Sequence, residues 1–290
     1  MSDSCVDLSA NLAKELELEI IPLSVEVKGK TYYNYLDERD ITFKSFYNEL
    51  RNNIVTKTSM INPNEFVEFM EPFLKNGYDI LYVAFSSALS GTYNSSLIAK
   101  EELDSTYPDR KIICIDSLCA SMGQGLLLTY ASKLKNAGKS IEEVAKFVED
   151  TKLNICHLFT VGDLNHLRRG GRLSYAKAFL GTVLRIKPLL NVNKEGKLIQ
   201  TGSTRGRKQS LTKMVERMKE TIDNPKDQVI YISHGDCLEE VLELKREIIK
   251  ELTVKDIVIN YIGPVIGSHS GLGTVAIFYK GCDRTLPYSK

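Results

Sequence analysis

The stretch Asp79–Asn94, which reads DILYVAFSSALSGTYN, decides how this chain of 290 residues folds. Its first part, Ile80 to Phe85, is a short apolar run bounded by polar residues, which is typical of a buried strand in a parallel sheet. The next residues are small and polar, and from Thr92 onward apolar residues recur at helical spacing. The stretch therefore predicts a strand, a tight loop and the start of a helix.

This loop is a candidate anion site. Its hydroxyls and backbone N–H groups would meet at a helix N-terminus, where unsatisfied donors and the helix dipole favour negative charge. The hydroxyls belong to Ser86, Ser87, Ser90 and Thr92. In the simpler alternative, Ser90 or Thr92 is only the N-cap of the helix, which is the commonest use of such a residue. Taken alone, the loop favours the cap.

Strands and helices alternate along the chain, which indicates an α/β fold with parallel strands. We expect an N-terminal parallel-sheet α/β domain at residues 1–155 and a C-terminal mixed α/β domain at residues 156–290. The expected strands of the first domain lie at 19–27, 80–85 and 111–115, and its helices at 8–18, 63–75, 121–137 and 140–152. Those of the second lie at 154–161, 187–192, 198–204, 229–233, 257–262 and 274–279, with helices at 206–221 and 238–252.

The N-terminus departs from this alternation. Asp3-Ser4 followed by a helix normally marks the end of a strand, yet no strand is apparent before it, so we expect the first strand to be missing or trimmed. Ligand loops of an open α/β sheet lie at the carboxyl ends of the strands. We therefore expect a common rim of hydroxyls formed by Ser4, Thr58, Ser90 and Ser117.

Composition excludes several classes of protein. The apolar fraction is 43%, and 38 basic residues nearly balance 37 acidic ones, so charge favours neither a nucleic acid nor a membrane surface as partner. The chain has no membrane-spanning apolar run and no signal segment, which predicts a cytoplasmic protein. Its six cysteines lack CxxC spacing and its four histidines form no HxxxH or HxH pair, so we expect reduced thiols and neither a metal site nor a cofactor.

Two glycine-containing segments stand out in the second half. The first, LNHLRRGGRLS at 164–174, predicts a helix that ends with left-handed backbone at Gly170 or Gly171. The second, Gly263–Gly273, surrounds His269 with four glycines, which would let the backbone approach a ligand closely. A lone histidine is more often structural than functional, but a histidine that only packs does not require flanking glycines.

These segments together resemble the DegV family of bacterial fatty-acid-binding proteins, which includes the binding subunits of fatty acid kinase. The resemblance covers nearly the whole chain and rests on the order and spacing of its motifs. The motifs are Asp3-Ser4 with Asp7-Leu8, Thr58-Ser59, SSALSGTYNS at 86–95, Asp116-Ser117 with Ser121 and Gly123, LNHLRRGGRLS, Lys187-Pro188, Arg205 and HSGLG at 269–273. It implies a two-domain DegV-like fold with a buried acyl chain.

The resemblance also implies site residues. Thr58 and Ser90 look like the hydroxyls that bind the fatty-acid carboxylate, with Ser59 and Gly91 beside them. His269 and Arg205 look like the contribution of the C-terminal domain near the head group. Two motifs depart from the family pattern: TSQPS is TSMIN at 58–62, and HxGPG is HSGLG, so that Leu272 replaces a stiffening proline. We also expect the family's usual first strand to be missing.

The implied function is non-catalytic lipid binding, in which the protein presents the carboxylate of a long-chain fatty acid to an ATP-dependent kinase subunit. The chain has no GxxxxGK[ST] cradle for ATP phosphates, so it would not transfer phosphate itself. A basic surface is a candidate for docking the kinase; the alternative, a solvated face, is the more frequent case. Its residues are Arg168, Arg169, Arg172, Arg205, Arg207 and Lys208.

Two other functions remain open. Ser90, His269 and Asp116 would make a hydrolase triad, although Ser90 lies in ALSGT and not in a GxSxG elbow. The same loops would also suit a nucleotide or sugar phosphate, although no GxGxxG motif or acidic ribose partner accompanies them.

Overall fold

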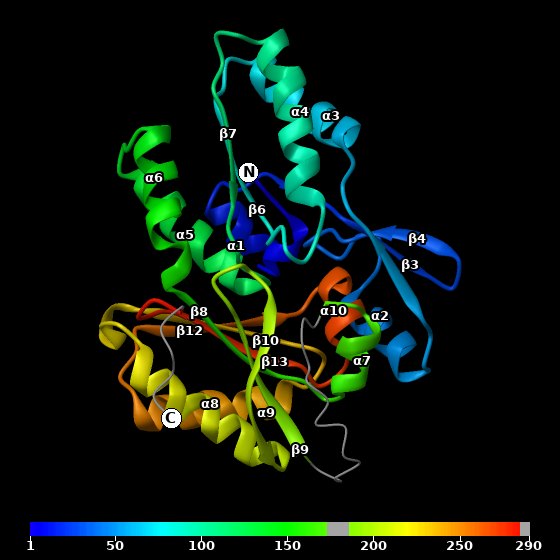
Figure 1. The fold of residues 1–290 in the computed structure, drawn as a ribbon, viewed down its shortest axis with the longest axis vertical. Helices are drawn as coiled ribbons and strands as arrows, with labels where there is room; N and C mark the ends of the chain where they lie inside the picture. The colour runs from blue at the N-terminus through cyan, green and yellow to red at the C-terminus, as the bar shows by residue number, and fades with distance from the viewer. Residues whose placement is uncertain (173–185, 285–290) are drawn as a thin grey trace.

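The computed structural model describes residues 1–172 and 186–284, whose strands form three sheets (Figure 1). The N-terminal sheet is parallel throughout, which confirms the parallel sheet predicted for this half. Its order is β2 (Ile20–Ile21), β1 (Ser2–Asp3), β6 (Ile80–Ala84) and β7 (Ile112–Asp116).

The C-terminal sheet is mixed, as predicted. Only β11 and β12 run parallel, and the other neighbours pair antiparallel. Its order is β10 (Leu198–Arg205), β9 (Ile186–Val192), β8 (Ile155–Thr160), β13 (Val275–Lys280), β11 (Val229–His234) and β12 (Asp256–Tyr261).

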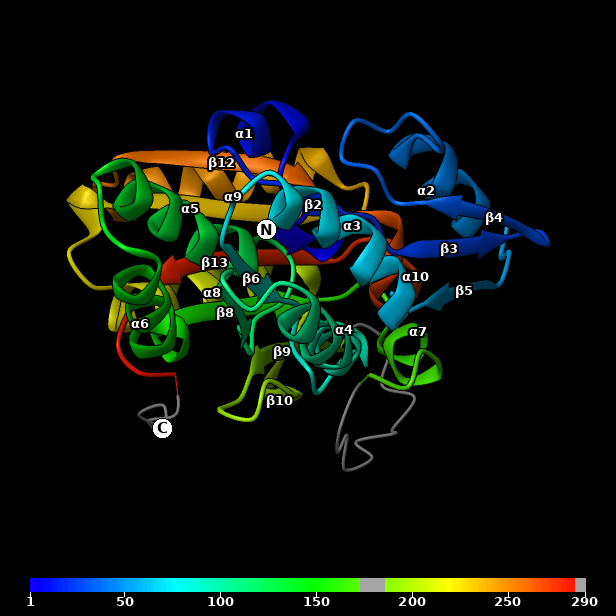
Figure 2. The same ribbon diagram turned by 90° about the horizontal axis from the view of Figure 1, so that it is seen from above.

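A third, antiparallel sheet consists of β4 (Lys30–Tyr33), β3 (Ser24–Val27) and β5 (Thr56–Ser59). The single strand predicted at 19–27 is therefore wrong: β2 and β3 belong to different sheets and are separated by Pro22 and Leu23. Proline has no N–H to donate to a sheet, so it interrupts the strand. Thr58 lies in β5 of the small sheet, which Figure 2 shows beside α2 and α10.

The expectation that no strand precedes Asp3 is also wrong. Strand β1 lies between β2 and β6, and Ser2 Oγ donates to Val83 O at 2.7 Å. Two residues suffice to form it because both neighbouring strands hold its backbone. After β1 come a 3-10 turn, η1 (Ser4–Val6), and a short helix, α1 (Ala10–Glu15), in place of the helix predicted at 8–18.

The helices form layers about the two main sheets (Figure 1). They are α2 (Phe43–Arg51), α3 (Pro63–Lys75), α4 (Thr92–Thr106), α5 (Met122–Asn136), α6 (Ile141–Thr151), α7 (Leu164–Arg169), α8 (Arg207–Thr221), α9 (Leu238–Glu251) and α10 (Pro264–Ser270), with 3-10 turns η2 (Lys152–Asn154) and η3 (Pro225–Asp227). Helices α8 and α9 cover the outer face of the C-terminal sheet, and α5 lies between its inner face and the N-terminal sheet.

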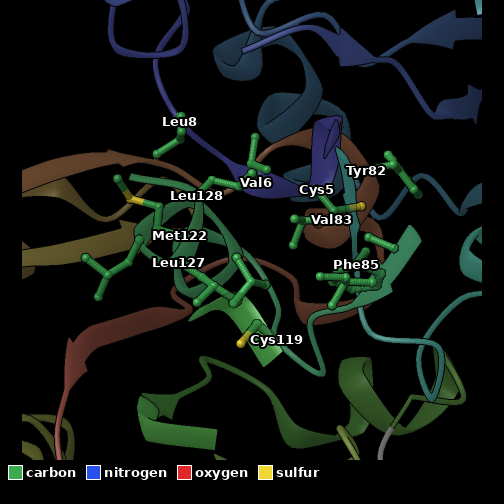
Figure 3. Close-up of a cluster of buried hydrophobic side chains, with 14 of the residues drawn as sticks. Cys5, Val6, Leu8, Tyr82, Val83, Phe85, Cys119, Met122, Leu127 and Leu128 are labelled. Carbon is green, nitrogen blue, oxygen red and sulfur yellow. The ribbon is translucent and has the colours of Figure 1, made fainter. Parts of the chain in front are cut away.

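One hydrophobic cluster joins the two halves. Figure 3 shows Val6 and Leu8 beside Met122 and Leu128 of α5, and the same cluster includes Phe278 of the C-terminal sheet. Because side chains of both halves belong to this one cluster, the domain boundary near residue 155 stays a prediction.

Candidate functional site

A cavity of about 300 Å³ lies between the inner face of the C-terminal sheet and the loops of the N-terminal half. Two rows of side chains from the C-terminal sheet line it, because residues paired across antiparallel strands share a face. Phe159, Ala276 and Ser233 form one row across β8, β13 and β11, and His157 lies opposite Phe278 in the next. Most of this floor is therefore apolar.

The remaining walls are also largely apolar. The β9–β10 hairpin contributes Val192 and Leu198, and α10 contributes Val265 and Ile266. The N-terminal half contributes Leu23, Phe85, Leu89 and Met60. An interior of this kind suits a hydrocarbon, since apolar surface gains free energy when it leaves water.

The polar end of the cavity is built around His269 at the end of α10. Its Nε2 lies 2.8 Å from Thr58 Oγ1, and its Nδ1 lies 3.1 Å from the carbonyl oxygen of Gly170. A carbonyl only accepts, so Nδ1 carries the proton, and Thr58 donates its hydroxyl proton to Nε2. Burial, with the charge of Arg172 second, lowers the pKa of His269 to about 4, so the ring is neutral at pH 7.

Ser90 and Gly91 line the same cavity where α4 begins. Ser90 Oγ lies 2.8 Å from Thr92 Oγ1 and accepts a hydrogen bond from the Thr92 N–H at 3.3 Å. The N-cap of α4 is Gly91 and no side chain caps it, so the alternative in which Ser90 or Thr92 is only the N-cap is wrong. Met60 covers Gly91: a Cβ added to the glycine would lie 2.5 Å from Met60 Sδ.

Five of the six predicted site residues line one cavity: Thr58, Ser59, Ser90, Gly91 and His269. Arg205 does not, because it is exposed at the end of β10, where it pairs with Ile186. The arginine that lines the cavity is Arg172, whose Nε donates to Leu89 O at 3.0 Å. The available sequence signal was its position directly after Gly170-Gly171. Gly171 has φ +68°, which is the left-handed backbone predicted for this pair.

The predicted rim of four hydroxyls is wrong for two members. Ser4 Oγ accepts the Leu23 N–H and Ser117 Oγ accepts the Cys119 N–H, and neither residue lines the cavity. Ser86 of the β6–α4 loop donates instead to Gly196 O at 2.9 Å. These three hydroxyls hold loops together and are not available to a ligand.

The hydrolase triad is not assembled. The ring nitrogens of His269 contact Thr58 and Gly170, and Ser90 Oγ contacts Thr92. Asp116 Oδ1 accepts the backbone N–H groups of Ser87 and Leu118 and has no bond to the histidine. A nucleophile without a base in contact is not activated.

Within residues 1–172 and 186–284, no cluster of three or more His, Cys, Asp and Glu side chains would hold a metal ion, and no helix has the length and apolar character to cross a membrane. The six cysteines are free thiols. Leu173 and Ser174, which end the predicted LNHLRRGGRLS motif, lie outside the described residues.

Comparison with known proteins agrees with the sequence motifs. The family model described as "Uncharacterised protein, DegV family" matches residues 1–281. A DegV domain-containing protein of Clostridium perfringens is 46% identical over 280 residues, which are 97% of this chain and 96% of the relative. The chain belongs to the DegV family. The predicted resemblance and the predicted α/β fold class are thereby confirmed.

Solved structures of DegV proteins share the fold over almost their whole length. A DegV family protein from Thermus thermophilus, described as binding fatty acid, has a TM-score of 0.87 at 29% identity, with 96% of this chain and 98% of that chain covered. DegV from Bacillus subtilis, described as a fatty acid binding protein, has a TM-score of 0.81 at 29% identity, with 96% of each chain covered.

Proposed function

We propose that this DegV protein binds a long-chain fatty acid, with its carboxylate at Thr58, Ser90 and His269 and its acyl chain along the apolar floor of the cavity. The observation that carries the proposal is the 2.8 Å contact between Thr58 and His269, 211 residues apart, at the polar end of an otherwise apolar cavity. The fatty-acid binding described for the solved relatives supports the same ligand class.

The acyl chain would supply most of the affinity. Burial contributes about 0.8 kcal/mol per methylene, so ~15 methylenes offer a gross term of ~12 kcal/mol before the losses that accompany binding. The carboxylate must replace its water with hydrogen bonds, and two hydroxyls that line the cavity would donate them: Thr58 on β5 and Ser90 just before α4. The head group therefore determines orientation more than affinity.

Binding of a carboxylate would also change the protonation state of His269. In the structure, Thr58 donates its only hydroxyl proton to His269 Nε2. If Thr58 turns that proton to the ligand, the lone pair of Nε2 faces a carboxylate without a donor between them. A proton on Nε2 removes this repulsion and adds a charge-assisted hydrogen bond. We infer that His269 takes up one proton when the fatty acid binds as its anion.

We further propose that the protein does not catalyse a reaction, but presents the carboxylate to an ATP-dependent fatty acid kinase subunit that forms the acyl phosphate. The exposed residues Arg168, Arg169, Arg205 and Lys208 are the proposed docking surface, to which Arg205 would contribute without touching the ligand. Arg207 is excluded from it, because its guanidinium bonds Glu240 and Gly273 O. Incubation of the loaded protein with the kinase subunit and ATP should yield acyl phosphate, which neither protein yields alone.

Mass spectrometry of an organic extract of the purified protein tests the ligand class directly, and we expect a co-purifying long-chain acid. Thr58→Ala and Ser90→Ala should each weaken binding by about two- to tenfold without abolishing it, as expected for one net hydrogen bond. Ser105→Ala is the matched control, since Ser105 is an exposed hydroxyl on the same α4 helix. Full affinity in both cavity variants, measured on folded protein, would contradict the assignment.

A further inference from the structure

The cavity wall carries a second polar group, contributed by elements other than those that hold Thr58 and His269. Ser121, at the start of α5, and Ser233, on β11, both line the cavity, and their hydroxyl oxygens are 2.8 Å apart. Behind them lies Asp7, which is 2% exposed and accepts a short hydrogen bond from Ser121. Three distant segments thus place two hydroxyls and a carboxylate beside a lipid cavity.

The hydrogen bonds within this group have a defined direction. Asp7 Oδ1 accepts the Gly263 N–H at 2.9 Å, and Oδ2 accepts the Ser121 hydroxyl. Burial raises the pKa of Asp7 to about 7, so above this pH the carboxylate is ionised and only accepts. Ser121 then donates to it, and Ser233 in turn donates to Ser121. Both hydroxyl protons are then committed. What the pair can still offer to the cavity is acceptor lone pairs.

The position of the pair favours contact with a ligand. Ser233 lies in the same floor row as Ala276 and Phe159, so a chain lying along the floor passes it. A further cavity-lining hydroxyl, Ser270 Oγ, is buried and has no partner among the described residues. A buried hydroxyl without a hydrogen-bond partner is unfavourable, and a purely hydrocarbon ligand would leave Ser270 Oγ without one.

We propose that the Ser121–Ser233 pair is a subsite for a hydroxyl group on the acyl chain, so that hydroxylated long-chain fatty acids belong to the ligand class of this protein. The proposal rests on the fatty-acid binding proposed above and refines it. Because the pair only accepts, it recognises a hydroxyl, which donates, and not a keto group at the same carbon, which cannot.

The competing explanation is purely structural, in which the cluster joins the N-terminal segment to the C-terminal sheet and leaves no acceptor for a ligand. The two explanations differ in what they predict for ligands. If the cavity wall offers no partner for a hydroxyl, every hydroxylated acid should bind more weakly than the parent acid, because a buried hydroxyl without a hydrogen bond is unfavourable. If the pair is a subsite, the isomer whose hydroxyl reaches it should bind as tightly as the parent acid or more tightly.

The test uses the delipidated full chain and displacement of a fluorescent fatty acid, with octadecanoic acid, a panel of hydroxyoctadecanoic acids that differ in hydroxyl position, and the matching oxo acids. Burial raises the pKa of Asp7 to about 7, so the measurements are made near pH ~8.5, where the carboxylate is ionised. We expect one positional isomer to bind about two- to tenfold more tightly than its neighbours, as one net hydrogen bond allows. Its oxo analogue should show no such preference.

Ser233→Ala should abolish the preference among the hydroxylated isomers, whereas Ser132→Ala should keep it. Ser132 is a matched control because it is a buried hydroxyl that donates to Leu16 O and does not line this cavity. Equal weakening of all hydroxylated isomers, or a preference that survives in Ser233→Ala, would overturn the subsite. Failure to bind octadecanoic acid itself would instead overturn the proposed function.

Discussion

Replacing His269 by glutamine tests whether fatty-acid binding takes up a proton. The wild-type ring has a pKa of about 4 and is neutral at pH 7. Protonating it there costs about 4 kcal/mol, since each pH unit between pKa and solution corresponds to about 1.4 kcal/mol. The bound carboxylate must supply at least this much for the proton to stay on the ring. The glutamine side chain offers an N–H donor that needs no proton from solution.

The expected result is a difference in pH dependence. A fatty acid with an ordinary carboxyl pKa of about 4 is ionised above pH ~6. If the complex holds one proton more than the free species, the wild-type Kd rises about tenfold per pH unit between pH ~6 and ~8. His269→Gln should bind with a Kd that is nearly independent of pH over this range, because glutamine does not titrate.

The Kd values can be measured by displacement of a fluorescent fatty acid, and proton uptake by calorimetry in two buffers with different ionisation enthalpies. Wild type should take up close to one proton per ligand near pH 7, and the variant close to none. Ligand self-association affects both proteins equally, so the comparison removes it. Parallel pH profiles for the two proteins, or equal binding enthalpies of wild type in both buffers, would refute the proton argument.

Three other variants test individual contacts. Asp7→Asn should flatten the pH dependence of stability, measured by urea titration. Burial raises the pKa of Asp7 from 3.8 to about 7, so its contribution to stability is full below pH ~4 and is lost as pH rises to ~7. The unfolding free energy of wild type should fall by about 4 kcal/mol over this range. If wild type and variant lose stability equally, Asp7 is not the group responsible. Arg172→Gln should raise the pKa of His269, seen by NMR titration of the ring; an unchanged or lower value would contradict the charge effect. Gly123→Ala should destabilise the protein by about 1–3 kcal/mol despite the better helix propensity of alanine, because its Cβ would lie 2.3 Å from the buried His157 ring; an unchanged melting temperature would show that the ring can move aside.

Local signals were sufficient for most elements. The apolar run from Ile80 predicts β6, and the serine at 140 with Glu143 three residues on forms the capping box that begins α6. The hairpin turn after Val27 and the left-handed Gly171 also follow from residues close in sequence. Such features depend on side-chain period, capping and backbone freedom, which a few neighbouring residues determine.

The sequence alone also predicted residues that line the cavity. Thr58, Ser90 and His269 belong to its motifs and line the cavity, whereas Arg205 does not line it and Arg172 does. Arg172 reaches the cavity only because the turn at Gly171 and its bond to Leu89 O direct it there. No periodicity in the sequence reports that direction.

The sequence by itself determined the alternation of strands and helices, the two kinds of sheet and the family. Only the tertiary structure decided which hydroxyls face the cavity: Ser90 lines it, whereas Ser86 of the same loop bonds a hairpin 110 residues away. It likewise placed Asp7 behind Ser121 and Ser233, although 112 residues separate the two serines. The physical reason is that secondary structure follows local preferences, while the direction of a side chain depends on packing against segments far away in the chain.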